Sequence, residues 1–137
     1  MTDFFTKTDL SRKDAEKVVS ETLNKCDDGE LYLENSKTES IVLDDNRIKS
    51  SSYSSDLGYG LRAVTGEVVA YSHSNEISKN SLKQSSQNLQ STLKSTKGIY
   101  NHSISKTNEK FYKDINPIEN KSLDSKLKIL KEVNNYI

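Results

Sequence analysis

The clearest pattern in this sequence is an alternation of apolar and polar residues from Asp56 to Tyr71, interrupted at Thr65-Gly66. Successive side chains of a β-strand point to opposite faces of a sheet, so the alternation predicts two strands joined by a tight turn. Gly66 supplies the positive φ that a two-residue turn requires. The first strand is expected to carry apolar side chains on one face, namely Tyr59, Leu61 and Ala63, and Gly58, Gly60, Arg62 and Val64 on the other.

The residues before this hairpin also predict strands. We expect them at Leu31–Ser36 and Ser40–Asp44, followed by a turn at Asp45-Asn46 and a further strand over Arg47–Tyr53. Together with the Gly58–His73 hairpin they form an antiparallel β-meander.

Apolar residues at helical spacing predict three helices around this meander. The first runs from about Ser11 to Cys26, where Ser11 and Asp14 have the spacing of a capping box. The second starts near Asn75 and ends by Gly98, and the third follows the N-cap residue Ser122. Helices packed on one face of a sheet predict an α+β fold.

The third helix carries no sequence signal for its end. No Gly or Pro closes it, and residues of core type continue from Val133 to Ile137. We therefore expect a truncated chain, with an α+β domain at residues 1–98, a polar connector at 99–120, and at 121–137 the start of a helix leading into a missing second part. The alternative is a C-terminal helix that docks fully onto its own domain.

Composition limits both the core and the classes of partner. Only 32% of the 137 residues are hydrophobic and there is no Trp, which predicts marginal stability for the chain alone. The formal net charge is zero, and the 8 Lys of residues 97–137 are scattered among 5 acids. Lys residues scattered in this way do not form a basic surface that binds a phosphate backbone, so we expect no nucleic acid partner.

The sequence predicts a cytoplasmic protein without a membrane partner. Its first residues are acidic and form no apolar run, and no segment approaches membrane-spanning length. The single Cys26 cannot form an internal disulfide, which fits a reducing compartment.

The residues on the glycine-rich strand are the candidates for contacts with a peptide or a partner: Gly58, Tyr59, Gly60 and Arg62. Glycines in a strand favour close approach of another backbone or a ligand, although a twisted or bulged strand is the alternative. Arg62 can hold a carboxylate through a bidentate pair, or it can pack its stem on the sheet with its head in water.

No residues are expected to be catalytic or to bind a metal. Cys26, His73 and His102 are not spaced to place two ligands on one helical face, as zinc peptidases require. Cys26 is expected to be a small buried hydrophobe. The acidic residues of the first strands are expected to be solvated, namely Glu30, Glu34, Glu39, Asp44 and Asp45.

Four segments of the chain resemble the N-terminal domain of the TldD/PmbA metallopeptidase family, also called modulators of DNA gyrase. They are Asp28–Lys49, the Gly58-x-Gly60-x-Arg62-Ala63-x-x-Gly66 signature, Asn75–Ser78 and Tyr112–Pro117. The resemblance is closest to the TldD subunit. It implies a cytoplasmic zinc peptidase that works as a dimer of related subunits and cleaves unstructured peptides in an enclosed cavity, with this domain forming walls and subunit contacts. The zinc motif of the family, H-E-x-x-x-H with a distant Cys, is absent from this sequence.

The expected function is therefore that of the non-catalytic N-terminal portion of a TldD-like zinc metallopeptidase, with zinc held in the missing catalytic part. The expected partners are a catalytic TldD-like chain or a related subunit, and unstructured peptides. A free-standing module that binds peptides or proteins is one alternative, and a non-functional gene fragment is another.

Overall fold

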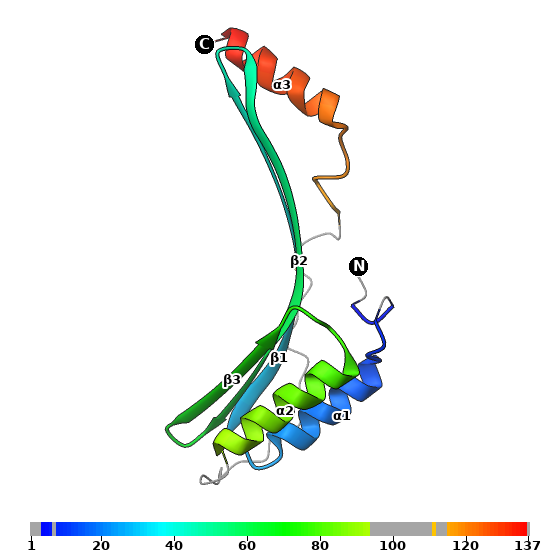
Figure 1. The fold of residues 1–137 in the computed structure, drawn as a ribbon, viewed down its shortest axis with the longest axis vertical. Coiled ribbons are helices and arrows are strands. Elements are labelled where there is room, and N and C mark those ends of the chain that lie inside the picture. The colour runs from blue at the N-terminus through cyan, green and yellow to red at the C-terminus, as the bar shows by residue number, and fades with distance from the viewer. Residues whose placement is uncertain (1–3, 7, 94–110, 112–114, 137) are drawn as a thin grey trace. The chain divides into compact units, whose positions relative to one another are not determined.

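The computed structural model describes residues 4–6, 8–93, 111 and 115–136. In this part of the chain three helices and three strands follow the order α1 (Arg12–Leu23), β1 (Asp28–Asp44), β2 (Arg47–Thr65), β3 (Val68–Ser74), α2 (Lys79–Leu93) and α3 (Leu123–Tyr136) (Figure 1). The strands form one sheet in the order β1-β2-β3, and tight turns make it an antiparallel meander. The predicted α+β class is confirmed.

The chain divides into two compact units. Unit 1 comprises Met1–Asn35 and Leu57–Glu109, and unit 2 comprises Ser36–Asp56 and Lys110–Ile137. Strands β1 and β2 therefore contribute residues to both units. The domain boundaries expected at residues 98 and 120 stay predictions.

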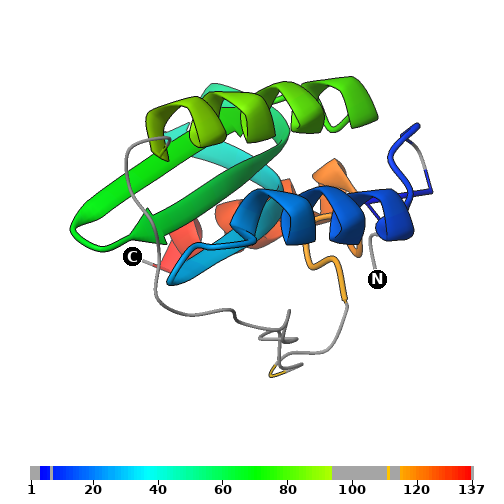
Figure 2. The ribbon, with the colours of Figure 1, turned by 90° about the horizontal axis from the view of Figure 1, so that it is seen from below.

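Unit 1 is a sheet with two helices on one of its faces. Figures 1 and 2 show α1 and α2 side by side over the same face, as predicted. Their apolar stripes meet the inward side chains of β2 and β3 in a core whose most deeply buried members are Leu10, Leu61, Ala63, Leu82 and Leu89. Ser11 caps α1, because its Oγ accepts the Asp14 backbone N–H at 3.0 Å and donates to Asp14 Oδ2 at 2.8 Å.

Unit 2 contains the far part of the β1–β2 hairpin and the helix α3. Ser122 caps α3, because its Oγ accepts the Ser125 backbone N–H at 3.3 Å, as predicted. No described residue of unit 2 is buried. This unit is therefore held by strand pairing and partly exposed side-chain contacts.

Two of the predicted strand boundaries are wrong. Strand β1 continues through residues 37–39 as one strand, and β2 continues from Arg47 to Thr65 without a break after Tyr53. The prediction relied on alternating apolar residues, which these Ser- and Lys-rich stretches lack. Backbone pairing across a hairpin satisfies N–H and C=O groups whatever the side chains are, so the ladder persists.

Two helix ends also differ from the prediction. Helix α2 begins at Lys79 because Ser78 acts as its cap, with Ser78 Oγ accepting the Ser81 backbone N–H at 3.1 Å. Asp9 Oδ1 accepts the N–H of Lys79 at 3.1 Å, which satisfies another donor of the first turn. Helix α1 ends at Leu23, and Lys25 has a φ of 84°, which a helix does not admit. The predicted end of α2 near Gly98 lies outside the described residues.

Both predicted hairpin turns are present. Asp45 and Asn46 have φ values of 48° and 58°, as a two-residue turn of the primed type requires. In the second hairpin Thr65 pairs with Val68, so the turn is formed by Gly66 and Glu67, one position later than predicted. Gly66 has the expected positive φ, 57°.

Candidate functional site

Tyr59 faces the helices. Only 4% of its surface is exposed, and its hydroxyl lies 2.8 Å from Ser81 Oγ and 2.8 Å from Ser85 Oγ on α2. Its neighbours Leu61 and Ala63 are buried on the same side, so the predicted alternation is confirmed. Tyr59 thus fixes β2 to α2.

The close approach predicted at the two glycines is made by the neighbouring strand β3. A Cβ atom on Gly60 would lie 2.5 Å from the hydroxyl oxygen of Tyr71, because the tip of that ring lies over the glycine. A Cβ on Gly58 would lie 2.8 Å from the carbonyl oxygen of Ser74. Glycine at both positions therefore allows β3 and its side chains to lie tightly against β2.

Arg62 is held by two carboxylates of β1. Its Nη2 donates to Asp28 Oδ2 at 2.7 Å and its Nε donates to Glu30 Oε1 at 3.0 Å. These hydrogen bonds, with that to Asp28 the stronger influence, raise the pKa of Arg62 above its ordinary value. The side chain keeps 34% of its surface exposed, so the cluster lies at the surface of unit 1.

The sequence analysis missed the role of Asp28 and Glu30. Counting outward from the Asp45-Asn46 turn does not reveal it, because uninterrupted pairing would bring Arg62 opposite Gly29 and would place the side chains of both acids on the other face of the sheet. In the structure Arg62 shares a face of the sheet with Asp28 and Glu30, whereas a Cβ on Gly29 would point to the other face, against Leu23 Cδ2 of α1.

The sheet face of unit 1 opposite α1 and α2, which we call the open sheet face, carries exposed aromatic residues. Tyr71 is cross-strand to Arg62, is 63% exposed and stacks on His73 with ring centroids 5.8 Å apart. Tyr32 is 59% exposed, and its hydroxyl donates to Glu34 Oε2 at 3.0 Å, which raises the pKa of Tyr32. This face combines flat rings with carboxylates.

In unit 2, α3 and the segment before it are attached to the hairpin by polar contacts. Lys126 Nζ donates to Glu39 Oε2 and, at 2.6 Å, to the carbonyl oxygen of Ile118. Lys37 Nζ lies 2.5 Å from Glu119 Oε1. This pairing raises the pKa of Lys37 and lowers that of Glu119. Near the other end of α3, Asn134 Nδ2 donates to Asn46 Oδ1 at 3.1 Å.

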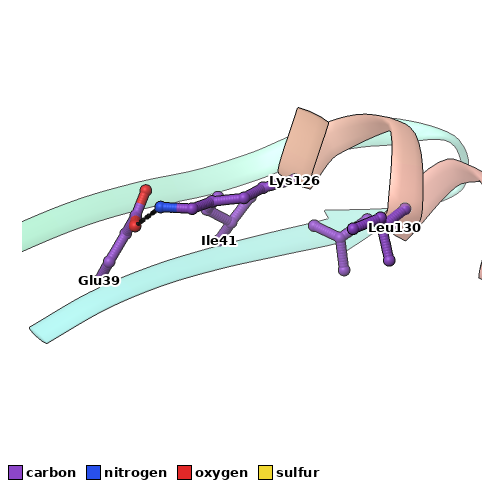
Figure 3. A pocket seen from close by; sticks show the side chains of 5 residues that line it. Glu39, Ile41, Lys126 and Leu130 are labelled. Carbon is purple, nitrogen blue, oxygen red and sulfur yellow. Dashed lines mark hydrogen bonds and ion pairs between the residues drawn. The ribbon is translucent and has the colours of Figure 1, made fainter. Parts of the chain in front are cut away.

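A pocket of about 290 Å³ lies beside these contacts, between α3 and strand β1 (Figure 3). Its walls are aliphatic apart from one ion pair, and they are formed by Glu39, Ile41, Lys126, Ile129 and Leu130. Lys126 and Glu39 are 21% and 18% exposed, so this pair is shielded from water more than the other ion pairs of unit 2.

One stripe of α3 is apolar and exposed. Ile129, Val133 and Tyr136 have the spacing i, i+4 and i+7 and therefore share a helix face. They are 43%, 54% and 94% exposed. We call these three residues the α3 stripe.

The candidate metal ligands do not gather in the described part of the chain. No group of three or more His, Cys, Asp or Glu side chains there is arranged to hold a metal ion. Cys26 is buried, with its Sγ 3.7 Å from the carbonyl oxygen of Thr22, as the sequence predicts. His102 lies outside the described residues. None of the described helices has the length and apolar character needed to span a membrane.

Comparison with known proteins identifies the family. Residues 29–96 match the family model described as PmbA/TldA metallopeptidase domain 1. A metalloprotease TldD homolog of Buchnera aphidicola subsp. Acyrthosiphon pisum is 35% identical over 109 residues, which are 79% of this chain and 23% of that protein. The metalloprotease TldD homolog of Haemophilus influenzae is 32% identical over 107 residues, covering 76% of this chain and 22% of that protein.

This chain belongs to the TldD/PmbA metallopeptidase family. A further TldD homolog, from Buchnera aphidicola subsp. Schizaphis graminum, is 27% identical over 130 residues, or 93% of this chain and 27% of that protein. The chain thus spans about a quarter of the length of these TldD relatives. The domain matched in the family contains Arg62 and its partner Glu30, with all of the β1–β2 hairpin except Asp28.

Proposed function

We propose that this chain acts as the non-catalytic N-terminal portion of a TldD-like zinc metallopeptidase and docks onto the catalytic part through unit 2. The observation that supports this most directly is the absence of any buried residue among the described residues of unit 2. The large apolar side chains that this unit leaves exposed are Val42, Ile48, Tyr53, Phe111, Ile115, Leu123, Ile129, Val133 and Tyr136.

This number of exposed apolar side chains favours the binding of a protein partner to unit 2. Unit 2 gains little from burial by itself, and covering its apolar surface would stabilise it in proportion to the area removed from water. The α3 stripe has the spacing of the anchor residues with which an amphipathic helix enters an apolar groove. The matched relative from Buchnera aphidicola subsp. Acyrthosiphon pisum is about four times as long as the aligned segment, and the proposed groove belongs to its unaligned region.

Binding is tested by co-expressing this chain with a tagged polypeptide that carries the unaligned region of the TldD homolog of Buchnera aphidicola subsp. Acyrthosiphon pisum. We expect the two to elute together on size exclusion. Replacing Ile129, Val133 and Tyr136 by Ala keeps helix propensity but removes the anchors. If each anchor contributes about 1 kcal/mol to binding, the dissociation constant rises about a hundredfold.

The matched control replaces three exposed polar residues of the same helix, Lys128, Lys131 and Glu132, by Ala. We expect this variant to bind within about threefold of the unmodified chain, because exposed charges contribute little. Equal loss of binding in both variants, or equal retention in both, contradicts docking through the α3 stripe.

A second candidate function is contact with unstructured peptides on the open sheet face, beside Gly60 and Arg62. Exposed Tyr71 and the carboxylates around Arg62 support it. Fluorescence anisotropy of a labelled unstructured peptide would detect binding by the chain alone. Tyr71→Ser is expected to weaken it, whereas Tyr53→Ser, an equally polar change in unit 2, is not. Peptide binding by an isolated monomer would favour a free-standing interaction module.

A further inference from the structure

The pocket between α3 and β1 is lined mainly by apolar surface, with one charged pair in its wall. Ile41, Ile129 and Leu130 contribute branched aliphatic side chains, and Lys126 contributes the methylene groups of its stem (Figure 3). It is an open depression of about 290 Å³ on the surface of unit 2, so a side chain of a partner can enter it without a change in the backbone.

The one charged pair in the wall is already satisfied. The ammonium of Lys126 is hydrogen bonded to Glu39 and to the carbonyl oxygen of Ile118. The charges of Lys126 and Glu39 cancel, and a charged ligand would have to break their contact to find a counter-ion. An uncharged apolar group needs no such partner and would displace water held by aliphatic walls.

The pocket is continuous with the α3 stripe, because Ile129 belongs to both. A partner that covers Ile129 and Val133 must therefore pass the mouth of the pocket. We propose that the pocket receives one large uncharged side chain, of the Leu, Met or Phe type, from the catalytic part of a TldD-like chain. This inference rests on the proposed function and adds the anchor that the partner supplies.

The ligand class is tested first on the intact chain without a partner. Methyl signals of Ile41, Ile129 and Leu130 are followed by NMR while N-acetyl-phenylalanine amide, N-acetyl-leucine amide, N-acetyl-lysine amide or N-acetyl-glutamate amide is added. We expect saturable shifts at millimolar concentrations with the first two probes and none with the two charged probes. Absence of shifts, or equal shifts with all four, overturns the inference.

Filling the pocket tests its part in docking. Leu130→Trp from the helix and Ile41→Phe from the strand occupy the space from opposite walls, and both should abolish the shifts. In the co-expression experiment each should weaken the complex at least tenfold. Ser51→Trp is the control, since Ser51 is exposed on the hairpin, does not line the pocket and is not one of the apolar residues proposed for docking.

The outcomes separate the pocket from the proposed function. If the α3 stripe variant loses the complex while both filled variants keep it, the pocket inference is wrong and docking through unit 2 stands. If no complex forms with any variant or with the unmodified chain, the proposed function fails, and the NMR titration alone decides whether the pocket binds apolar groups.

Discussion

Units 1 and 2 share two strands, yet they are stabilised in different ways. In unit 1 the inward side chains of β2 pack against two helices. The helices are also joined by a buried hydrogen bond, in which Thr22 Oγ1 of α1 lies 2.6 Å from Ser86 Oγ of α2. In unit 2 the same strand has every described side chain from Arg47 to Asp56 exposed. In unit 2, pairing with β1 is therefore sufficient to keep β2 extended. In unit 1, burial of side chains in a core also stabilises the fold.

The largest expected difference concerns apolar truncation. Leu82 is fully buried on α2, so Leu82→Ala should destabilise unit 1 by about 3 kcal/mol through lost transfer energy and a cavity. The same change at half-buried Leu130 on α3 should cost about 1 kcal/mol or less. Urea unfolding followed by circular dichroism measures both. Equal losses would show that unit 2 has a core of its own.

The glycines of β2 test how tightly unit 1 is packed. An added Cβ at Gly58 meets the backbone oxygen of Ser74, whereas at Gly60 it meets the tip of the Tyr71 ring, which can rotate away. We expect Gly58→Ala to cost about 2 kcal/mol and Gly60→Ala about 1 kcal/mol or less. Tyr71→Ala should remove the cost at Gly60 only. If Gly60→Ala destabilised the Tyr71→Ala variant as much as it destabilises the unmodified chain, this account would be contradicted.

Sequence reasoning succeeded where burial produces a pattern. The alternation around Leu61 predicted the inward face of β2, and the capping pattern at Ser11 predicted the start of α1, because both signals are local. It failed in the Ser-rich parts of β1 and β2, where pairing rather than burial keeps the chain extended.

The contacts of the candidate site were less predictable than the fold. The glycine-rich strand indicated close approach, but the approaching groups, Tyr71 and Ser74, come from the next strand and depend on register. The ion pair of Lys126 with Glu39 joins residues 87 positions apart, and no local pattern encodes it. Counting from the predicted turn at Thr65-Gly66 would have shifted the pairing of β2 with β3 by two residues, and no count along the chain recovers the ion pair.

The shielded ion pair of unit 2 should matter more than its exposed ones. Lys126→Met keeps the stem but leaves Glu39 without its partner, so we expect α3 amides to exchange about tenfold faster, corresponding to about 1 kcal/mol. Lys49→Met is the control, because Lys49 and Asp44 are 67% and 64% exposed. Hydrogen exchange measured by mass spectrometry should show little change for it. Equal acceleration in both variants would contradict the importance of shielding.

The smallest expected effect is the pH dependence contributed by Asp14 of unit 1. Its Oδ1 accepts a hydrogen bond from Lys79 Nζ at 2.9 Å and its Oδ2 accepts one from Ser11 Oγ at 2.8 Å. These bonds, with that from Lys79 the larger cause, lower the pKa of Asp14 from its ordinary value of 3.8. Because the folded pKa is the lower one, the stabilisation is complete above the unfolded pKa and is lost as pH falls through the folded pKa.

Asp14→Asn should therefore be less stable than the unmodified chain at pH 6, and the difference should shrink at pH 3 and below. Urea unfolding at these pH values measures it. Glu119→Gln is the matched change in unit 2, where the pKa of Glu119 is lowered by Lys37, and it should leave the unfolding of unit 1 unchanged. If the difference in unfolding free energy between Asp14→Asn and the unmodified chain stays constant with pH, the negative charge of Asp14 does not contribute to stability. An effect of Glu119→Gln on unit 1 would instead mean that the two units unfold together, since only coupled unfolding lets a charge in one unit stabilise the other.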